Sequence, residues 1–221
     1  MCYRFTLAAD PIQLATFFEL LDVPGLVPRY NVAPRQLVAV IGRRGDGTGR
    51  GLVNMLWGFV PRWANDPTSG PRPMNARSET VRTSAPFRDS FRDRRCLIPA
   101  DGFYEWEDNP SGKQPWHFRR PDRMPFAFAG IWDIWKGTDR SLYTCAILTT
   151  TPNETVKPLH DRMPVVIPRD QYSAWLDPQT DPAFAHSLLK PAPDDYFERV
   201  AVKREVNKVT TEGPQLLESL S

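Results

Sequence analysis

The sequence predicts a single α+β domain over residues 1–221, built on a curved, mainly antiparallel β-sheet with a barrel-like core and peripheral helices. Strand-like segments far outnumber helical ones, and few of them follow the β–α–β order that builds parallel sheets. No internal repeat or long linker divides the chain, and its length suits one domain. The 23 prolines are spread along the chain, which indicates many short elements joined by rigid turns.

The helices are expected from local start signals and apolar spacing. The first begins after Asp10, because Asp10 suits an N-cap and Pro11 suits the first helical position. Further helices are expected in part of Ser78–Arg94 and over Gln171–Leu176 and Pro182–Leu189.

The strands are expected from short apolar or alternating runs bounded by turn residues. These runs are Gln36–Gly42, Leu52–Val60, Cys96–Ala100, Phe103–Glu107, Trp116–Arg119, Phe126–Trp135, Leu142–Thr149, Met163–Ile167 and Phe197–Val202. Gly45–Gly51 is expected to be a hairpin loop, and Asp101-Gly102 marks a turn between two apolar runs. The residues after Gly213 are expected to fray.

Composition narrows the class of protein. With 41% hydrophobic and 24% charged residues, the chain matches ordinary globular proteins. No apolar run approaches a membrane span, and no apolar stretch of a secretory signal follows the first positive charge. Three widely spaced cysteines argue against a disulfide framework, and no Cys/His pair has zinc-ligand spacing. We therefore expect a cytoplasmic, reduced protein with no membrane partner, metal or cofactor.

The net charge of +2 does not by itself indicate a nucleic-acid partner. Between Arg72 and Arg95, however, seven arginines face three acidic residues, a local excess of four positive charges. Arginine presents a planar fork that matches phosphate, so this run favours phosphate binding. The alternative is a solvated helical face with pairs of opposite charge.

Cys2 is the first residue that could carry chemistry. A small second residue allows methionine aminopeptidase to remove Met1, and the chain would then begin with a cysteine bearing a free α-amine and a thiol. Roughly a tenth to a fifth of such an amine is neutral at pH 7. It can condense with an aldehyde to a Schiff base, which the thiol then closes to a thiazolidine ring. The alternative is a small, half-buried residue at the start of a strand.

Three other segments carry candidate residues. Asn75 offers donors and acceptors and Arg77 a phosphate-matching fork, while Ser78 suits a helix cap. Glu105 lies between aromatic neighbours on a strand, where apolar surroundings would raise its pKa and let it transfer protons. A solvent-facing glutamate is the alternative. His160 lies in a proline-flanked turn, where it is a general acid or base, or a structural residue.

Aromatic residues suggest a surface for bases. In Trp57–Trp63, an exposed Trp63 could stack on bases with Arg62 near a phosphate, whereas Trp57 is expected in the core. Cys96 is also expected in the core, and His117 and His186 are expected to be structural.

Together these segments resemble the SOS-response-associated peptidase (SRAP) family. The resemblance runs from Cys2 to at least Pro168. It is carried by Met1-Cys2, Tyr30–Pro34, Trp57–Trp63, Asn75–Thr80, Cys96–Trp106 and His160–Pro164. It implies one α+β domain around a barrel-like core that captures abasic sites in single-stranded DNA covalently and protects them during replication. Abasic-site lyase activity and N-terminal maturation by autoproteolysis or an aminopeptidase are also implied.

The resemblance further implies residue roles. Cys2 is the nucleophile, Asn75 orients the N-terminus and the opened sugar, Glu105 assists ring opening and Schiff-base proton transfer, and His160 assists proton transfer and reversal. The implied DNA contacts are Arg4, Arg77, Arg162, Trp63 and Trp106. We expect a monomer, associated with the nucleoid when bound to DNA.

Two other classes of function stay open at this point. One is a thiol peptidase that uses Cys2 or Cys145 with His160. The other is a single-stranded DNA binder without covalent chemistry. Trapping of a peptide acyl-enzyme would identify the first, and a DNA complex that never resists denaturation would identify the second.

Overall fold

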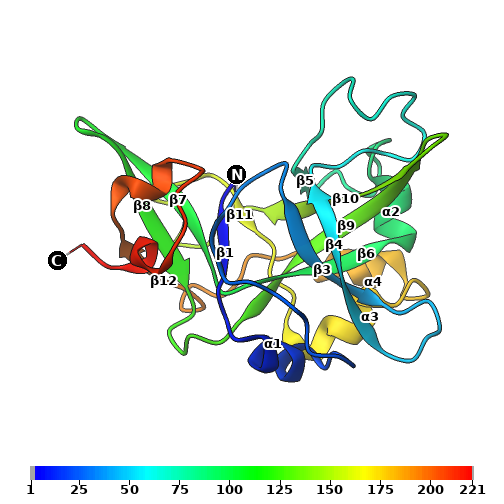
Figure 1. The fold of residues 1–221 in the computed structure, drawn as a ribbon, viewed down its shortest axis with the longest axis horizontal. Coiled ribbons are helices and arrows are strands. Elements are labelled where there is room, and N and C mark those ends of the chain that lie inside the picture. The colour runs from blue at the N-terminus through cyan, green and yellow to red at the C-terminus, as the bar shows by residue number, and fades with distance from the viewer. Residues whose placement is uncertain (1–2, 221) are drawn as a thin grey trace.

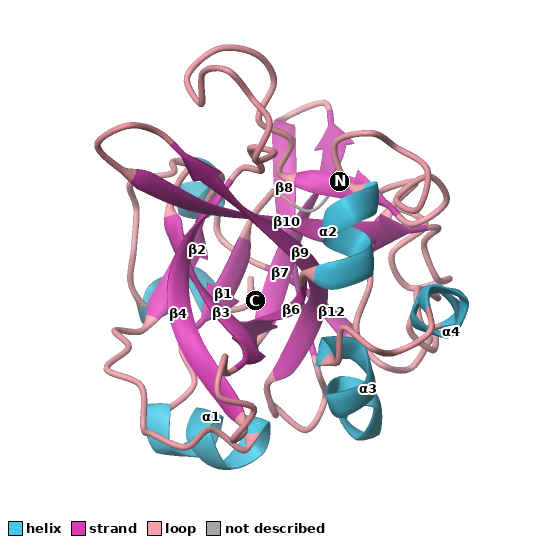
Figure 2. Ribbon diagram, turned by 90° about the vertical axis from the view of Figure 1, so that its right-hand side faces the viewer, coloured by secondary structure: helices cyan, strands magenta, loops and turns pink. Residues whose placement is uncertain are grey.

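The computed structural model describes residues 3–220, within which twelve strands, four α-helices and three short 3-10 helices form two sheets with peripheral helices (Figures 1 and 2). This architecture confirms the predicted α+β class with a mainly antiparallel, barrel-like core. Cys2 lies outside the described residues.

The larger sheet has seven strands, five of which close into a ring. Its members are β3 (Leu37–Arg43), β4 (Arg50–Trp57), β5 (Asn75–Arg77), β6 (Arg95–Ala100), β9 (Phe126–Lys136), β10 (Ser141–Thr150) and β11 (Met163–Pro164). The neighbours run β10-β4-β3-β6-β9, and β9 pairs with β10 again. β10 is parallel to β4 and β5, whereas the other pairs are antiparallel. β10 is therefore the strand that closes the barrel.

The smaller sheet is antiparallel throughout. Its order is β12-β8-β7-β1-β2, from β12 (Glu198–Ala201), β8 (Gly112–Arg119), β7 (Gly102–Asn109), β1 (Phe5–Leu7) and β2 (Arg29–Val32). The C-terminal segment, red in Figure 1, lies beside β7 and β8. The N- and C-terminal parts of the chain are thus brought into one sheet.

The helices are short. They are α1 (Pro11–Phe18), α2 (Arg88–Asp93), α3 (Tyr172–Leu176) and α4 (Pro182–Ser187), with 3-10 turns at Arg169–Gln171, Arg204–Asn207 and Pro214–Leu217. α1 begins as predicted, because Asp10 Oδ1 accepts hydrogen bonds from the backbone N–H groups of Ile12 and Gln13 at 2.9 and 3.1 Å. In the described part of the chain, no helix has the length and apolarity to cross a bilayer.

Two apolar clusters follow from the alternation of side chains along the barrel strands. On β3, Val38 and Val40 pack in a cluster that joins the barrel to the smaller sheet. Ala39 and Ile41 pack in another, which joins the barrel to the helices. Trp57 and Cys96 are fully buried in the first cluster, as predicted.

One turn differs from its prediction and another matches it. Ser78 does not cap a helix: it is buried after β5, where its N–H donates to Thr149 O at 2.9 Å, and α2 begins only at Arg88. Asp101-Gly102 separates two apolar strands as predicted, and these strands, β6 and β7, lie in different sheets. A Cβ on Gly102 would lie 2.0 Å from His117 Nε2, so close packing explains this glycine.

The C-terminal end also differs from its prediction. Instead of fraying, residues after Gly213 form the 3-10 turn Pro214–Leu217, and Leu216 is fully buried against Tyr104 and Val202. The segment is also held by a backbone hydrogen bond from Leu220 N to Ala201 O at 2.9 Å and by the ion pair of Glu218 with Lys203.

Candidate functional site

The C-terminal end of β10 brings two candidate segments together. β5 pairs with β10 through Asn75 opposite Ile147 and Arg77 opposite Thr149, while β11 pairs through Met163 opposite Thr150. The segment around Asn75 and the segment that ends in β11 therefore flank the same few residues of β10.

The first described residues join this region from the smaller sheet. Phe5 packs edge-on against Trp57 with ring centroids 5.3 Å apart, and Trp57 Nε1 donates to Met74 O at 2.8 Å. The backbone of Arg4 accepts a hydrogen bond from Tyr104 N at 3.0 Å, directly before Glu105. The start of β1 is thereby packed beside Met74, which precedes Asn75, and paired with the residue that precedes Glu105.

Glu105 is buried in β7, with 3% of its surface exposed. Burial, and to a lesser extent the carboxylate of Asp161, raise the pKa of the Glu105 carboxyl to about 8, against the smaller opposing effect of Lys113. The group is mostly protonated at neutral pH and can donate a proton. The influence of Asp161 also places the His160–Asp161 turn near Glu105.

His160 is half-buried in the turn before β11. Its Nδ1 accepts a hydrogen bond from Arg162 N at 3.0 Å and also lies 2.9 Å from Asp161 Oδ1. Neutral Nδ1 can accept only the first contact, whereas a protonated ring can donate to Asp161. Burial lowers the pKa of His160, and Asp161 opposes this effect. The ring is therefore mainly a neutral base at pH 7.

Arg162 is held within the protein. Its guanidinium contacts both carboxylate oxygens of Glu79, at 2.6 and 2.8 Å, and donates to Thr149 O at 2.7 Å. Arg162 hydrogen bonding lowers the pKa of Glu79. Arg77, by contrast, is exposed at the end of β5. A phosphate near Arg162 would have to share it with Glu79.

Arg4 and Trp106 contact the C-terminal part of the chain. Arg4 Nη1 donates to Asn31 Oδ1 at 2.7 Å and to Val206 O at 3.0 Å, and its guanidinium lies 5.8 Å from the Trp106 ring centre. Trp106 Nε1 donates to Asn207 Oδ1 at 2.6 Å. Both side chains thus have structural contacts in addition to the DNA role that the sequence predicts.

Trp63 is exposed, with 61% of its surface accessible, on the long loop between β4 and β5. The loop is anchored to β9: Arg62 N and Nε both donate to Asp133 at 2.9 Å, and Trp135 Nε1 donates to Ala64 O at 2.7 Å. An exposed ring on an anchored loop suits stacking on a base.

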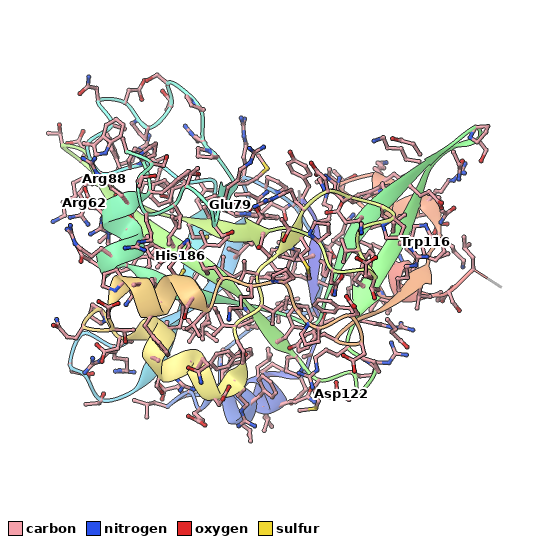
Figure 3. The ribbon with its side chains drawn as sticks, turned by 180° about the vertical axis from the view of Figure 1, so that it is seen from behind. Arg62, Glu79, Arg88, Trp116, Asp122 and His186 are labelled. Carbon is pink, nitrogen blue, oxygen red and sulfur yellow. The ribbon has the colours of Figure 1, made fainter. Side chains whose placement is uncertain are left out.

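The arginine run does not form one helical face. Arg77, Arg82, Arg88 and Arg92 are exposed, whereas Arg95 is buried and donates to backbone carbonyls at the ends of α2 and α3. Figure 3 shows Arg62 and Arg88 near the end of the molecule opposite Trp116. The exposed arginines are available to phosphates, while Arg95 is structural.

The two described cysteines are unsuitable as nucleophiles. Cys96 and Cys145 are fully buried, and burial raises the pKa of both thiols. Cys145 therefore cannot serve a thiol peptidase in this fold. His117 and His186 have structural settings: His117 is buried near Thr6, and His186 Nε2 lies 2.9 Å from Ser78 O.

Within residues 3–220, no three His, Cys, Asp or Glu side chains gather in a metal-binding arrangement. The pairing of Glu79 with Arg162 is the site contact that sequence reasoning missed. Glu79 lies 83 positions from Arg162, so no local pattern could reveal that pair. The carboxylate of Asp161 beside His160 was visible in the sequence.

This fold and site define the class of protein. The profile of the SOS response associated peptidase (SRAP) family matches residues 1–209, and the chain belongs to this family. It is similar to the abasic site processing protein YoqW of Bacillus subtilis (strain 168), with 39% identity over 99% of this chain and 100% of the relative. The abasic site processing protein HMCES of Gallus gallus is 31% identical over 86% of this chain and 66% of the relative.

Solved structures share the fold. A protein from Bacteroides thetaiotaomicron aligns over 100% of both chains with a TM-score of 0.89 and 22% identity. A protein from Bordetella bronchiseptica aligns over 91% of this chain and 100% of the other, with a TM-score of 0.80 and 25% identity. The architecture described above is therefore shared with these solved structures.

Proposed function

We propose that this protein captures abasic sites in single-stranded DNA through a covalent thiazolidine link to Cys2, after removal of Met1. The observation that carries the proposal is the position of Glu105. A buried carboxyl with a pKa of about 8 adjoins the strand that begins three residues after Cys2. The relatives' names as abasic site processing proteins support the same substrate.

The chemistry follows from the residues at the site. The neutral α-amine of Cys2 adds to the C1′ aldehyde of the opened sugar, and protonated Glu105 assists loss of water to give the Schiff base. The thiol of Cys2 then adds to the imine carbon, and its proton passes to the nitrogen. One water is released in total. Asn75 orients the amine and the sugar through its amide.

His160 supports the reverse direction. Its neutral ring can take up and return a proton at the sugar, which assists reopening of the ring and release of the aldehyde. If the Schiff base persists, β-elimination of the 3′ phosphate competes with ring closure, which is the lyase activity. The proposed activities require no metal or cofactor.

Arg77 and Arg162 would hold phosphates that flank the lesion, and Trp63 would stack on a neighbouring base. Each phosphate contact to a single strand contributes about −0.7 to the slope of log K against log salt. Replacement of Arg77 by alanine should remove about one such contribution.

We further propose that the protein acts as a monomer in the cytoplasm.

The deciding experiment is an intact mass of the protein mixed with abasic single-stranded DNA under denaturing conditions, without reductant. We expect a mass equal to protein plus DNA minus one water. Cys2→Ala should give no adduct while it keeps the fold and most DNA binding. Cys2→Ser keeps the amine, so its Schiff base should survive only after borohydride reduction.

A variant with an uncleavable extension before Cys2 tests the amine separately. It keeps the thiol and the DNA-binding surface but has no free α-amine, and it should therefore form no stable adduct. Efficient trapping by this variant would contradict the proposal and favour a thiol mechanism. DNA binding without any adduct in the parent protein would favour a non-covalent binder.

A further inference from the structure

Asn31 is the second residue of the Tyr30–Pro34 motif, to which the chemistry above assigns no role. The residue is fully buried at β2. Its Oδ1 accepts the hydrogen bond from Arg4 Nη1 at 2.7 Å. Its Nδ2 lies 3.2, 3.1 and 3.0 Å from the carbonyl oxygens of Val206, Lys208 and Thr211. One amide therefore links the N-terminal strand to the C-terminal segment.

The C-terminal segment encloses Arg4 from a second side. We call residues 204–212 the clasp. Val206 O accepts from Arg4 Nη1 at 3.0 Å, and Asn207 Oδ1 accepts from the indole of Trp106, over which the Arg4 guanidinium lies. Arg4 is thus held by Asn31, by the clasp backbone and by an aromatic ring that the clasp itself positions.

The clasp is also fixed at its far end. Glu212 accepts hydrogen bonds from Arg29 Nε at 2.9 Å and from the backbone N–H of Tyr30 at 2.8 Å. These bonds involve the two residues that precede Asn31, so the clasp is bound to three successive residues of β2, Arg29, Tyr30 and Asn31. Its movement relative to β2 is thereby restricted.

Asparagine suits this position for a chemical reason. Its amide is at once an acceptor for a guanidinium and a donor to carbonyl oxygens. Alanine would leave the buried Arg4 and the clasp carbonyls without these bonds, which is costly. Aspartate would retain the acceptor for Arg4 but place a carboxylate against the carbonyls. Substitution by aspartate therefore tests the bond to Arg4 separately from the bonds to the clasp carbonyls.

We propose that Asn31 and the clasp position Arg4 and, through it, the reactive Cys2. The Cα atoms of residues 2 and 4 lie within about 7 Å of each other by covalent geometry, so a fixed Arg4 confines the nucleophile. Asn31 is a positioning residue, since it acts through Arg4. The inference rests on the proposed function, and it predicts loss of crosslinking rate rather than loss of phosphate contacts.

The test compares Asn31→Ala and Arg4→Met with the parent protein. Single-turnover crosslinking of an abasic strand at saturating protein gives the rate, and binding of a lesion-free strand gives the affinity and its salt slope. We expect both variants to crosslink at least about tenfold more slowly, because small misplacements of reacting groups are costly. The salt slope of Asn31→Ala should equal that of the parent. Asn31→Asp should retain more of the rate than Asn31→Ala.

Two controls isolate positioning from stability. Asn54→Ala makes the same change at an exposed site on β4, and Leu14→Ala removes a buried side chain in α1. Both should crosslink like the parent at a temperature where every variant is folded. Unchanged crosslinking in Asn31→Ala would overturn the inference, as would equal rates in Asn31→Asp and Asn31→Ala. A salt slope shallower by about 0.7 in Asn31→Ala would also overturn it, because Asn31 would then act on a phosphate contact.

A parent protein that forms no adduct would overturn the proposed function instead. The clasp would then be tested by amide hydrogen exchange of residues 204–212. Asn31→Ala should accelerate this exchange and Asn54→Ala should not. Unchanged exchange in Asn31→Ala would show that Asn31 does not hold the clasp.

Discussion

The guanidinium of Arg162 and the carboxylate of Glu79 form a two-point ion pair, with N–O distances of 2.6 and 2.8 Å. Because Glu79 competes with any phosphate that binds Arg162, we predict that Glu79→Gln tightens binding of lesion-free single-stranded DNA. An exposed ion pair contributes about 0.2–1 kcal/mol, so the gain should be roughly 1.5- to 5-fold. Fluorescence anisotropy at fixed salt measures it. Glu19→Gln, at the end of α1, is the charge-matched control, and weaker binding in Glu79→Gln would show that Glu79 orients Arg162 for DNA.

Glu105 should give stability a distinctive pH dependence. Its folded pKa of about 8 lies above the ordinary value of 4.5, so the folded protein keeps a proton that the unfolded chain loses between these values. The free energy of unfolding contributed by Glu105 therefore falls as pH rises through this window. Relative to the parent, Glu105→Gln should gain about 1–4 kcal/mol between pH 5 and 8. Urea unfolding across this range measures the gain, and parallel profiles for variant and parent would refute the assignment. Glu107→Gln, exposed on the same strand, is the control.

His160 should matter more for reversal than for capture. His160→Ala removes the neutral ring that can accept and return a proton, and its effect should be concentrated in release of the aldehyde. We expect the reversal rate to fall about 100-fold or more, the usual contribution of a general acid or base, while the capture rate changes much less. Transfer of preformed adduct to excess competitor DNA measures reversal. A larger loss in capture would assign His160 to the forward step.

Gly102 is required by close packing at the junction of the two sheets. A Cβ at this position would lie 2.0 Å from His117 Nε2 and 2.9 Å from Phe118 O. We predict that Gly102→Ala lowers the free energy of unfolding by about 1–3 kcal/mol, the usual cost of overpacking. Gly42→Ala, which has no neighbour within 4 Å, should have little effect in the same chemical denaturation experiment. Equal stability of the two variants would show that β8 moves freely away from β7.

Thiol reactivity should distinguish Cys2 from the other two cysteines. Cys96 and Cys145 are fully buried with raised pKa values, so neither supplies an accessible thiolate. A chromogenic disulfide reagent at pH 7.5 should titrate one thiol rapidly in the folded protein and all three after unfolding. Cys2→Ala should lose the rapid phase. A second rapid thiol in the folded protein would mean that the barrel opens on the timescale of the assay.

Elements with local signals were predictable from the sequence. α1 begins at Asp10-Pro11 as expected, because both the cap and the proline act within one turn. The long strands β9 and β10 match their apolar runs to within a residue or two at each end. The strands β1, β2 and β5 were not predicted as strands, since three or four residues are too few to show a period.

Closure of the barrel was not predictable, because it depends on pairing between distant segments. Cys145 pairs in parallel register with Trp57, and Ile147 with Asn75. The sequence around these residues does not indicate which segment each one pairs with. At the site, the apolar neighbours of Glu105 indicated its raised pKa. The roles of Asn31 and Glu79 depend on contacts with residues far along the chain, so they required the fold.

The hydrogen bond from Arg4 to the backbone of Val206 joins positions 202 residues apart. A chain emerging from the ribosome exposes its first residues early, but it lacks the clasp that holds Arg4 until nearly all of the polypeptide has been made. Contacts of such long sequence separation form late in folding, and synthesis proceeds at about 5–20 residues per second. The contact between Arg4 and the clasp therefore forms roughly 10–40 seconds after Arg4 itself has been made.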